Sequence, residues 1–150
     1  MTPALLIQSL CKFLEGVVEN YTLESNIKTL KTPQIVDGFL PPKKGNQPEA
    51  EFPYIIVRLV EGEDEKEEST TTIKMLFGTY SEDVQGFHDV LNLMEKVRQA
   101  LLKKRTIDNK FRMELPYKWE VPEEQPHPEW FGMSISKWII PKVLEENMNF

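Results

Sequence analysis

Two runs of strand-forming residues, separated by an acidic segment, constrain the fold of this chain most strongly. The first run, FPYIIVRLV at 52–60, is apolar at almost every position, and the second, 73–80, is rich in Ile, Phe, Thr and Tyr. The segment between them, 61–68, is strongly charged and has the composition of a hairpin tip held in water. A strand with consecutive apolar residues is covered on both faces of its sheet. We therefore expect strands near 53–60 and 70–80, with the first of them in a central position.

Helical periodicity is clearest between 84 and 103. Apolar residues recur there at steps of three and four, which is the spacing of one helical face. Asp83 precedes this stretch as a possible N-cap, and basic residues at 103–105 favour the negative end of the helix dipole. The apolar stripe consists of Phe87, Val90, Leu91, Met94, Val97 and Leu101.

A second helix is expected near 3–20, at the start of the chain. Thr2 is a favourable N-cap, and Pro3 suits the first helical position because its missing amide hydrogen has no partner there in any case. The apolar face of this helix comprises Leu6, Leu10, Phe13, Leu14, Val17 and Tyr21.

Two further strands are expected near 111–120 and 129–140. Apolar and polar residues alternate along the first, so one of its faces should be buried and the other wet. Pro116 lacks an amide donor, which predicts an edge position or a bulge in that strand. Ile35 and Val36 are consistent with a short additional strand that ends at Asp37.

These elements predict a single α+β domain over 1–150. Its antiparallel or mixed sheet should have about four strands, with two helices packed on one face. The sequence leaves open whether the last strand is parallel or antiparallel to its neighbours. Loops at 41–50 and 61–69 are expected to be mobile, and 142–150 should be a loose tail. We expect Phe87, Leu91 and Met94 to pack against Ile55, Val57 and Phe77.

The sequence contains no recognisable catalytic, cofactor or metal signature. Its two histidines, His88 and His127, are far apart, and they read as a helix-surface residue and an exposed loop residue. Cys11 is the single cysteine and reads as a small buried thiol. The acidic segment 61–68 lacks the alternating ligands of an EF-hand loop. Three tryptophans, Trp119, Trp130 and Trp138, read as core aromatics of strands. The prediction is that the protein is not an enzyme and needs neither a cofactor nor a metal.

Charge argues against a nucleic-acid-binding module. The formal net charge is -6 and the pI is about 5.1, whereas phosphate neutralisation requires an excess of Lys and Arg. The N-terminal stretch 1–16 lacks the basic region and the cleavage site of a signal peptide, and no apolar run is long enough to span a bilayer. We expect a protein without membrane contact that is made, and then kept or assembled, in the cytoplasm.

Extended segments of the chain resemble a family of small phage tail proteins. They include FPYIIVRLVEGED, FGTYSEDVQGFHDVLNLMEKVRQALL and LPYKWEVPEEQPHPEWFGMSISKWIIP, together with GFLPPK at 38–43. The resemblance spans about residues 35–141. Over this range the chain is similar to the tail-terminator, or tail-completion, proteins of long-tailed bacteriophages and prophages. It lies in extended similarity and includes no catalytic motif.

The resemblance implies a structural role in the virion tail. Tail terminators close as homohexameric rings on the last ring of the tail tube and offer a docking surface to the head-completion or neck protein. DNA would only pass through the lumen of such a ring, which we expect to be acidic or neutral; the acids could equally serve solubility alone. Assembly would take place in the cytoplasm of the bacterial host. The alternatives are a head-completion or neck adaptor, a small acidic binding or inhibitor protein, and an enzyme of unknown type.

Overall fold

A computed structural model of the protein describes residues 2–42 and 51–146. It contains two helices and eight strands within these residues. In chain order they are α1 (Pro3–Val17), β1 (Leu23–Glu24), β2 (Leu30–Lys31), β3 (Gln34–Asp37), β4 (Tyr54–Asp64), β5 (Ser69–Tyr80), α2 (Phe87–Lys103), β6 (Thr106–Ile107), β7 (Phe111–Glu120) and β8 (Glu129–Ile140). The two helices and the four long strands that the sequence predicts are confirmed, with small shifts of their ends.

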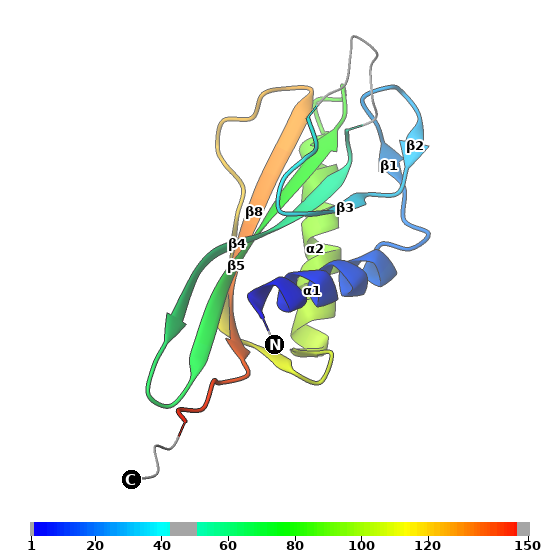
Figure 1. Ribbon diagram of the computed structural model, residues 1–150. Coiled ribbons are helices and arrows are strands. Elements are labelled where there is room, and N and C mark those ends of the chain that lie inside the picture. Colours follow the sequence, from blue (N-terminus) through cyan, green and yellow to red (C-terminus); the bar gives the residue numbers. More distant parts are fainter. Residues whose placement is uncertain (1, 43–50, 147–150) are drawn as a thin grey trace.

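Six strands form one curled sheet in the order β3-β4-β5-β8-β7-β6 (Figure 1). Only β3 and β4 are parallel, and every other neighbouring pair is antiparallel, so the sheet is mixed. The last strand, β8, lies antiparallel between β5 and β7. The prediction of about four strands is too low, because β6 and the separate β1-β2 pair have two residues per strand and show no periodicity in the sequence.

Helix α1 begins as its sequence predicts and ends three residues early. The Thr2 hydroxyl accepts a hydrogen bond from the Leu5 amide at 3.3 Å, and Pro3 occupies the first turn. Val18 caps the other end, and Asn20 then adopts a positive φ of 65°, which ends the helical path. The buried residues of α1 are Leu6, Leu10 and Leu14.

Helix α2 begins at Phe87, three residues after the predicted start. Asp83 does not cap it: the Asp83 carboxylate accepts from the Gln85 amide at 2.8 Å and orders the preceding turn. Gly86 is the N-cap, and a Cβ built there would lie 2.5 Å from Nε1 of Trp130. A side chain at this position would collide with the indole, so the close approach of Trp130 requires glycine.

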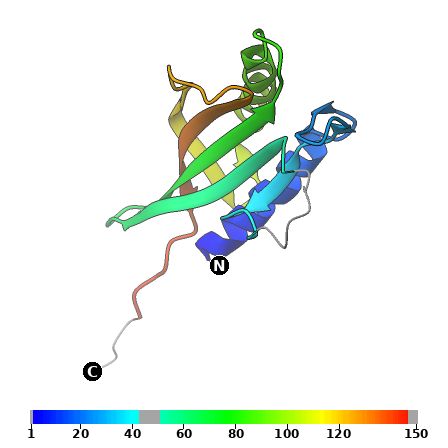
Figure 2. The same ribbon diagram turned by 90° about the horizontal axis from the view of Figure 1, so that it is seen from above.

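Both helices cover the same face of the sheet (Figures 1 and 2). Met94 lies in that core together with Ile55, Val57 and Phe77, as predicted. The prediction is wrong for Phe87, which is 36% exposed, and for Leu91, which is half-buried. The buried face of α2 is rotated toward Leu93, which is not part of the apolar stripe expected from the sequence. This face comprises Val90, Leu93, Met94, Val97 and Leu101.

The opposite face of the sheet, called the outer face below, is only partly covered. At one end Val36, Phe52, Tyr54 and Ile56 form a second apolar cluster. The ring of Tyr54 lies directly over Gly78 on β5, where a built Cβ would come within 2.3 Å of it. Glycine thus allows the aromatic ring to lie flat against the neighbouring strand.

Strand β7 departs from its predicted alternation in the middle. Phe111 and Met113 are fully buried, but Leu115 is 56% exposed. The pairing of β7 with β8 shifts register between Glu114 and Lys118, which is a bulge at Pro116, as the missing amide predicts. Leu115 lies on the outer face, whereas Tyr117 and Trp119 beyond the bulge return to the helix-facing side of the sheet.

The expected loops and tail differ in part from the structure. Strand β4 continues to Asp64 and β5 begins at Ser69, so only 65–68 form the turn, and β4 is longer than expected. Every residue from 59 to 67 is nevertheless exposed. Of the expected loop 41–50, residues 43–50 lie outside the described residues. Within the expected tail 142–150, residues 142–146 contain neither helix nor strand, and 147–150 are likewise outside the described range.

The rotation of α2 predicts different effects for two neighbouring leucines. Leu93→Ala should lower the free energy of unfolding by about 2–5 kcal/mol, because it opens a cavity in a fully enclosed site. Leu91→Ala, the matched control, should cost no more than about 1.5 kcal/mol because its side chain is partly in water. Urea unfolding of both variants measures the difference, and equal losses would show that the assigned buried face is wrong.

Candidate protein-interaction site

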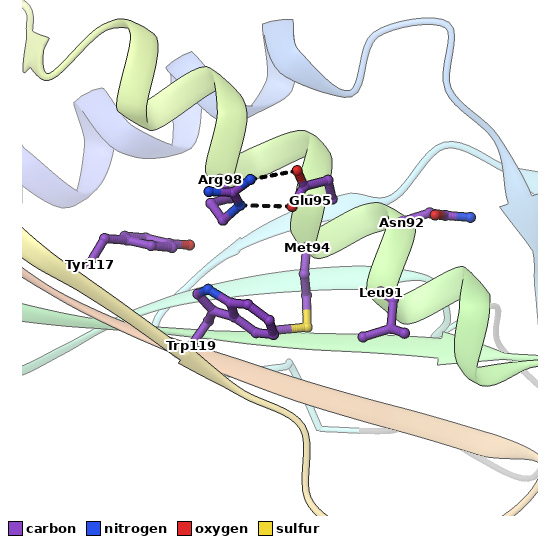
Figure 3. Close-up of a pocket in the computed structure, with 7 residues that line it drawn as sticks. All are labelled: Leu91, Asn92, Met94, Glu95, Arg98, Tyr117 and Trp119. Carbon is purple, nitrogen blue, oxygen red and sulfur yellow. Dashed lines mark hydrogen bonds and ion pairs between the residues drawn. The ribbon is translucent and has the colours of Figure 1, made fainter.

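A groove of about 270 Å³ with a mainly apolar lining lies between α2 and β7 on the helix side of the sheet. Figure 3 shows Met94 and Leu91 reaching from the helix toward the Trp119 ring, with Tyr117 at one end. We call it the α2–β7 groove. Its lining residues are Leu91, Asn92, Met94, Glu95, Arg98, Tyr117 and Trp119.

Trp119 distinguishes this groove from the rest of the core. Trp138 is fully buried and donates from Nε1 to Ser136 Oγ at 2.9 Å, and Trp130 is 9% exposed and donates to the Ser81 carbonyl at 3.0 Å. Both therefore confirm the prediction of core aromatics, whereas Trp119 is 55% exposed and corrects it. The alternation of β7 places Trp119 on the helix-facing side, as expected, but β7 lies at the margin of the cover that α2 provides, so the indole stays at the surface.

A fork of hydrogen bonds fixes the polar rim of the groove. Arg98 donates from Nε and Nη2 to the two carboxylate oxygens of Glu95, each at 2.7 Å, and Gln99 donates to the same carboxylate at 2.9 Å (Figure 3). These donors stabilise the charged form and lower the pKa of Glu95 to about 2. The rim is thus pre-organised, and its charges are already paired within the subunit.

Tyr117 closes one end of the groove. Burial raises the pKa of its phenol, against smaller opposing effects of Ser134 and the Arg98 charge. The ring therefore stays neutral and serves as an amphipathic wall. An apolar floor, two aromatic rings and a fixed polar rim match the composition of protein-binding surfaces, which are rich in Trp, Tyr and Met.

Two edges of the sheet are open beside these features. On one side β3 pairs with β4 only as far as Val57, so the outward edge of β4 from Arg58 to Asp64 has no neighbouring strand among the described residues. On the other side β6 covers β7 only at Phe111 and Arg112, and Arg105 pairs with the Met113 backbone. Among the described residues, the second open edge therefore runs from Glu114 to Glu120. Such edges offer unpaired backbone groups to a partner strand.

A second recess of about 410 Å³ lies across the exposed half of the outer face. Strands β4, β5, β7 and β8 all contribute to it, and its centre includes Ile135, which is 42% exposed. We call it the outer-face recess. It is lined by Glu61, Thr72, Glu114, Leu115, Pro116, Lys118, Ile135 and Lys137.

The residues considered for chemistry do not assemble into one site. His127 Nε2 lies 2.9 Å from the Glu82 carbonyl, and its ring packs edge-on against Trp130. His88 lies against Phe87 on the first turn of α2. Cys11 is half-buried beside the core, and burial, with the Asp37 and Glu15 charges, raises its pKa to about 11. Among the described residues, no three His, Cys, Asp or Glu side chains gather closely enough to hold a metal ion.

Comparison with known proteins gives no family assignment. No protein-family profile matches the chain, and no curated protein matches it significantly. Within residues 2–42 and 51–146, neither helix has the length and apolar character needed to cross a membrane.

The Glu95 fork predicts a pH-dependent contribution to stability. Because the pKa of Glu95 is lowered in the folded state, its stabilising effect should be fully present above about pH 4.5 and should disappear as the pH falls toward 2. Glu95→Gln should therefore destabilise the protein at pH 6 but match the wild type near pH 2. Arg98→Gln should reduce the same pH dependence, since the hydrogen bonds from Arg98 contribute most to the lowered pKa of Glu95. Thermal unfolding of the two variants across this pH range measures both effects. A constant difference at every pH would contradict the assignment.

Proposed function

We propose that the protein is a structural subunit of a phage tail, a tail terminator that closes as a hexameric ring on the end of the tail tube and presents a surface for head attachment. The extended resemblance of residues 35–141 to tail-terminator proteins is the support for the family. The structure supports a role in assembly through the surfaces that its own core leaves uncovered.

The exposed Trp119 in the α2–β7 groove carries this proposal. The Trp119 side chain is 55% exposed, so folding of the single subunit leaves much of its apolar surface in unfavourable contact with water. Tryptophan is the residue most enriched at the energetic centre of protein interfaces. Met94 and Tyr117 already line the groove beside Trp119, so a segment that enters the groove would bury the indole without reorganising the subunit.

The open edges suggest how copies could join. The β4 edge and the β7 edge lie on opposite sides of one sheet, so contact between them would join two different surfaces. A contact between different surfaces is heterologous and produces a ring when its rotation closes. The bulge at Pro116 and the charges on β4 also protect both edges from indiscriminate strand pairing.

The proposed lumen should not hold the DNA that passes through it. Four basic residues that would bind a duplex lie at the C-terminal end of α2 and just after it, namely Lys103, Lys104, Arg105 and Lys110. Arg105 is engaged with the Met113 carbonyl, and Lys110 lies 3.8 Å from Asp108. We place this end away from the lumen, because clustered free cations in a narrow channel would retain the genome.

The direct test is assembly with a tail tube. Purified protein should form six-fold rings, seen by native mass spectrometry and electron microscopy, at high concentration or on the ends of tubes built from the tube protein of the same genome. Added protein should also shorten the tubes by stopping their growth. Binding to a portal or neck complex instead of tube ends would favour the adaptor role, and a persistent monomer that inactivates a basic or nucleic-acid-binding partner would favour an inhibitor.

Replacement of Trp119 should separate assembly from folding. Trp119→Ala should change the free energy of unfolding little, because the side chain is largely exposed, but should weaken ring formation or tube capping at least about 30-fold, as expected of an interface hot spot. Val84→Ala is the matched control, since Val84 is 76% exposed and lies outside the groove. Normal capping by the Trp119 variant would exclude the groove from the interface.

A further inference from the structure

We propose that the exposed half of the outer face is a docking surface for the acidic β4–β5 hairpin tip of a second copy of this chain. The inference rests on the proposed assembly of identical subunits and identifies two of the surfaces that meet. It follows from a row of cations across the sheet and from the position of nearly all the net negative charge. It also follows from the absence of ion pairs at either place within the part of the chain that the structure describes.

The strand registers place three cations in one row of the outer face. Arg58 on β4 lies opposite Lys74 on β5, Lys74 lies opposite Ile135 on β8, and Ile135 lies opposite Lys118 on β7. The row spans about 14 Å, because neighbouring strands are about 4.8 Å apart. Lys137, two residues along β8 from Ile135, adds a fourth cation on the same face, where Glu114 of β7 lies opposite it.

This row is electrostatically unfavourable in the single subunit. Like charges directly opposite each other on paired strands destabilise a sheet, and Arg58 faces Lys74 in this way. Arg58 is partly accommodated, since its Nε donates to the Gly38 carbonyl at 3.0 Å and its guanidinium lies over the Phe39 ring. The three lysines make no ion pair within the described residues.

The negative charge of the chain is concentrated in the hairpin tip. Residues 61–68 contain six acidic residues and one lysine, so this segment has a formal charge of -5 out of the total of -6. Charge needed only for solubility would be spread over the surface rather than gathered in eight residues. The part of the sheet that holds this tip extends away from both helices (Figures 1 and 2).

Among residues 2–42 and 51–146, the acidic side chains of the tip also have no ionic partner. The ion pairs among described side chains join Arg98 to Glu95 and Lys110 to Asp108, and neither pair involves 61–68. The nearest basic contact is that of Lys142, whose Nζ donates to the backbone carbonyl of Lys66 and not to a carboxylate. Complementary charge on two unpaired surfaces of one chain favours contact between copies.

The outer-face recess supplies the shape for this contact. Its lining carries Lys118 and Lys137 together with Glu61 and Glu114, and its exposed apolar surface comes from Ile135 and Leu115. In the β4–β5 hairpin, exposed Leu59 and Val60 lie just before the acidic segment. A hairpin that enters the recess from a second copy would therefore bring apolar and acidic side chains to it together. The occupant we assign is therefore the 59–68 region of another copy.

A charge-swap experiment tests the proposal in the full-length chain. The face variant is Lys118→Glu with Lys137→Glu, the tip variant is Glu63→Lys with Glu65→Lys, and the combined variant carries all four changes. Lys12→Glu with Lys31→Glu, on exposed residues of α1 and β2, matches the charge change of the face variant. Self-association is measured by sedimentation at 50 mM and 500 mM salt, with melting temperatures to verify folding.

Wild-type association should weaken at high salt, since about 0.5 M salt shortens the screening length to a few ångströms. The face and tip variants should each raise the dissociation constant at least about tenfold, and the combined variant should return it to near the wild-type value. The control should associate like the wild type.

Several results would overturn the proposal: a wild type that stays monomeric at low salt and high concentration, a combined variant that remains impaired, or a control impaired to the same degree. Tight duplex DNA binding lost in the face variant would assign the cations to nucleic acid instead. Intact rings with unaffected charge variants would refute this inference alone, whereas charge-dependent association without rings or tube capping would refute only the proposed function.

Discussion

The pairing of β5 with β4 on one side and β8 on the other is the interaction on which the rest of the structure depends. It places Ile73, Met75 and Phe77 on one face of a mixed sheet, where α1 and α2 bury them. Two helices on one face leave the other face to be covered by different means. The second apolar cluster around Tyr54 and Ile56 covers one end of that face, and the remainder is left to water.

Each surface proposed for assembly follows from this arrangement. The α2–β7 groove exists because β7 lies at the margin of the cover that α2 provides, so Trp119 faces Met94 without being enclosed. The cationic row exists because the registers of four strands bring Arg58, Lys74 and Lys118 level on the uncovered face. Neither surface is required by the core, which is complete without them, so both are available for contacts with other chains.

Sequence reasoning identified the elements whose pattern is long and strong. Both helices and the four long strands have apolar repeats of their own, and the Thr2 cap and the bulge at Pro116 follow from local chemistry. It placed Leu91 rather than Leu93 in the core because both residues fit a three- or four-residue spacing, and only the docking angle of α2 decides between them. The exposure of Trp119 and the cationic row depend on strand register, which period-two patterns do not contain.

Hydrogen exchange of the free and assembled protein tests the central claim most directly, namely that the surfaces left uncovered by the core are the assembly interfaces. Assembly should slow exchange in the open half of β4, 58–64, and along the open edge of β7, 114–120, while α1 exchanges as it does in the free subunit. Protection confined to α1, or assembly without added protection on either strand, would contradict the account.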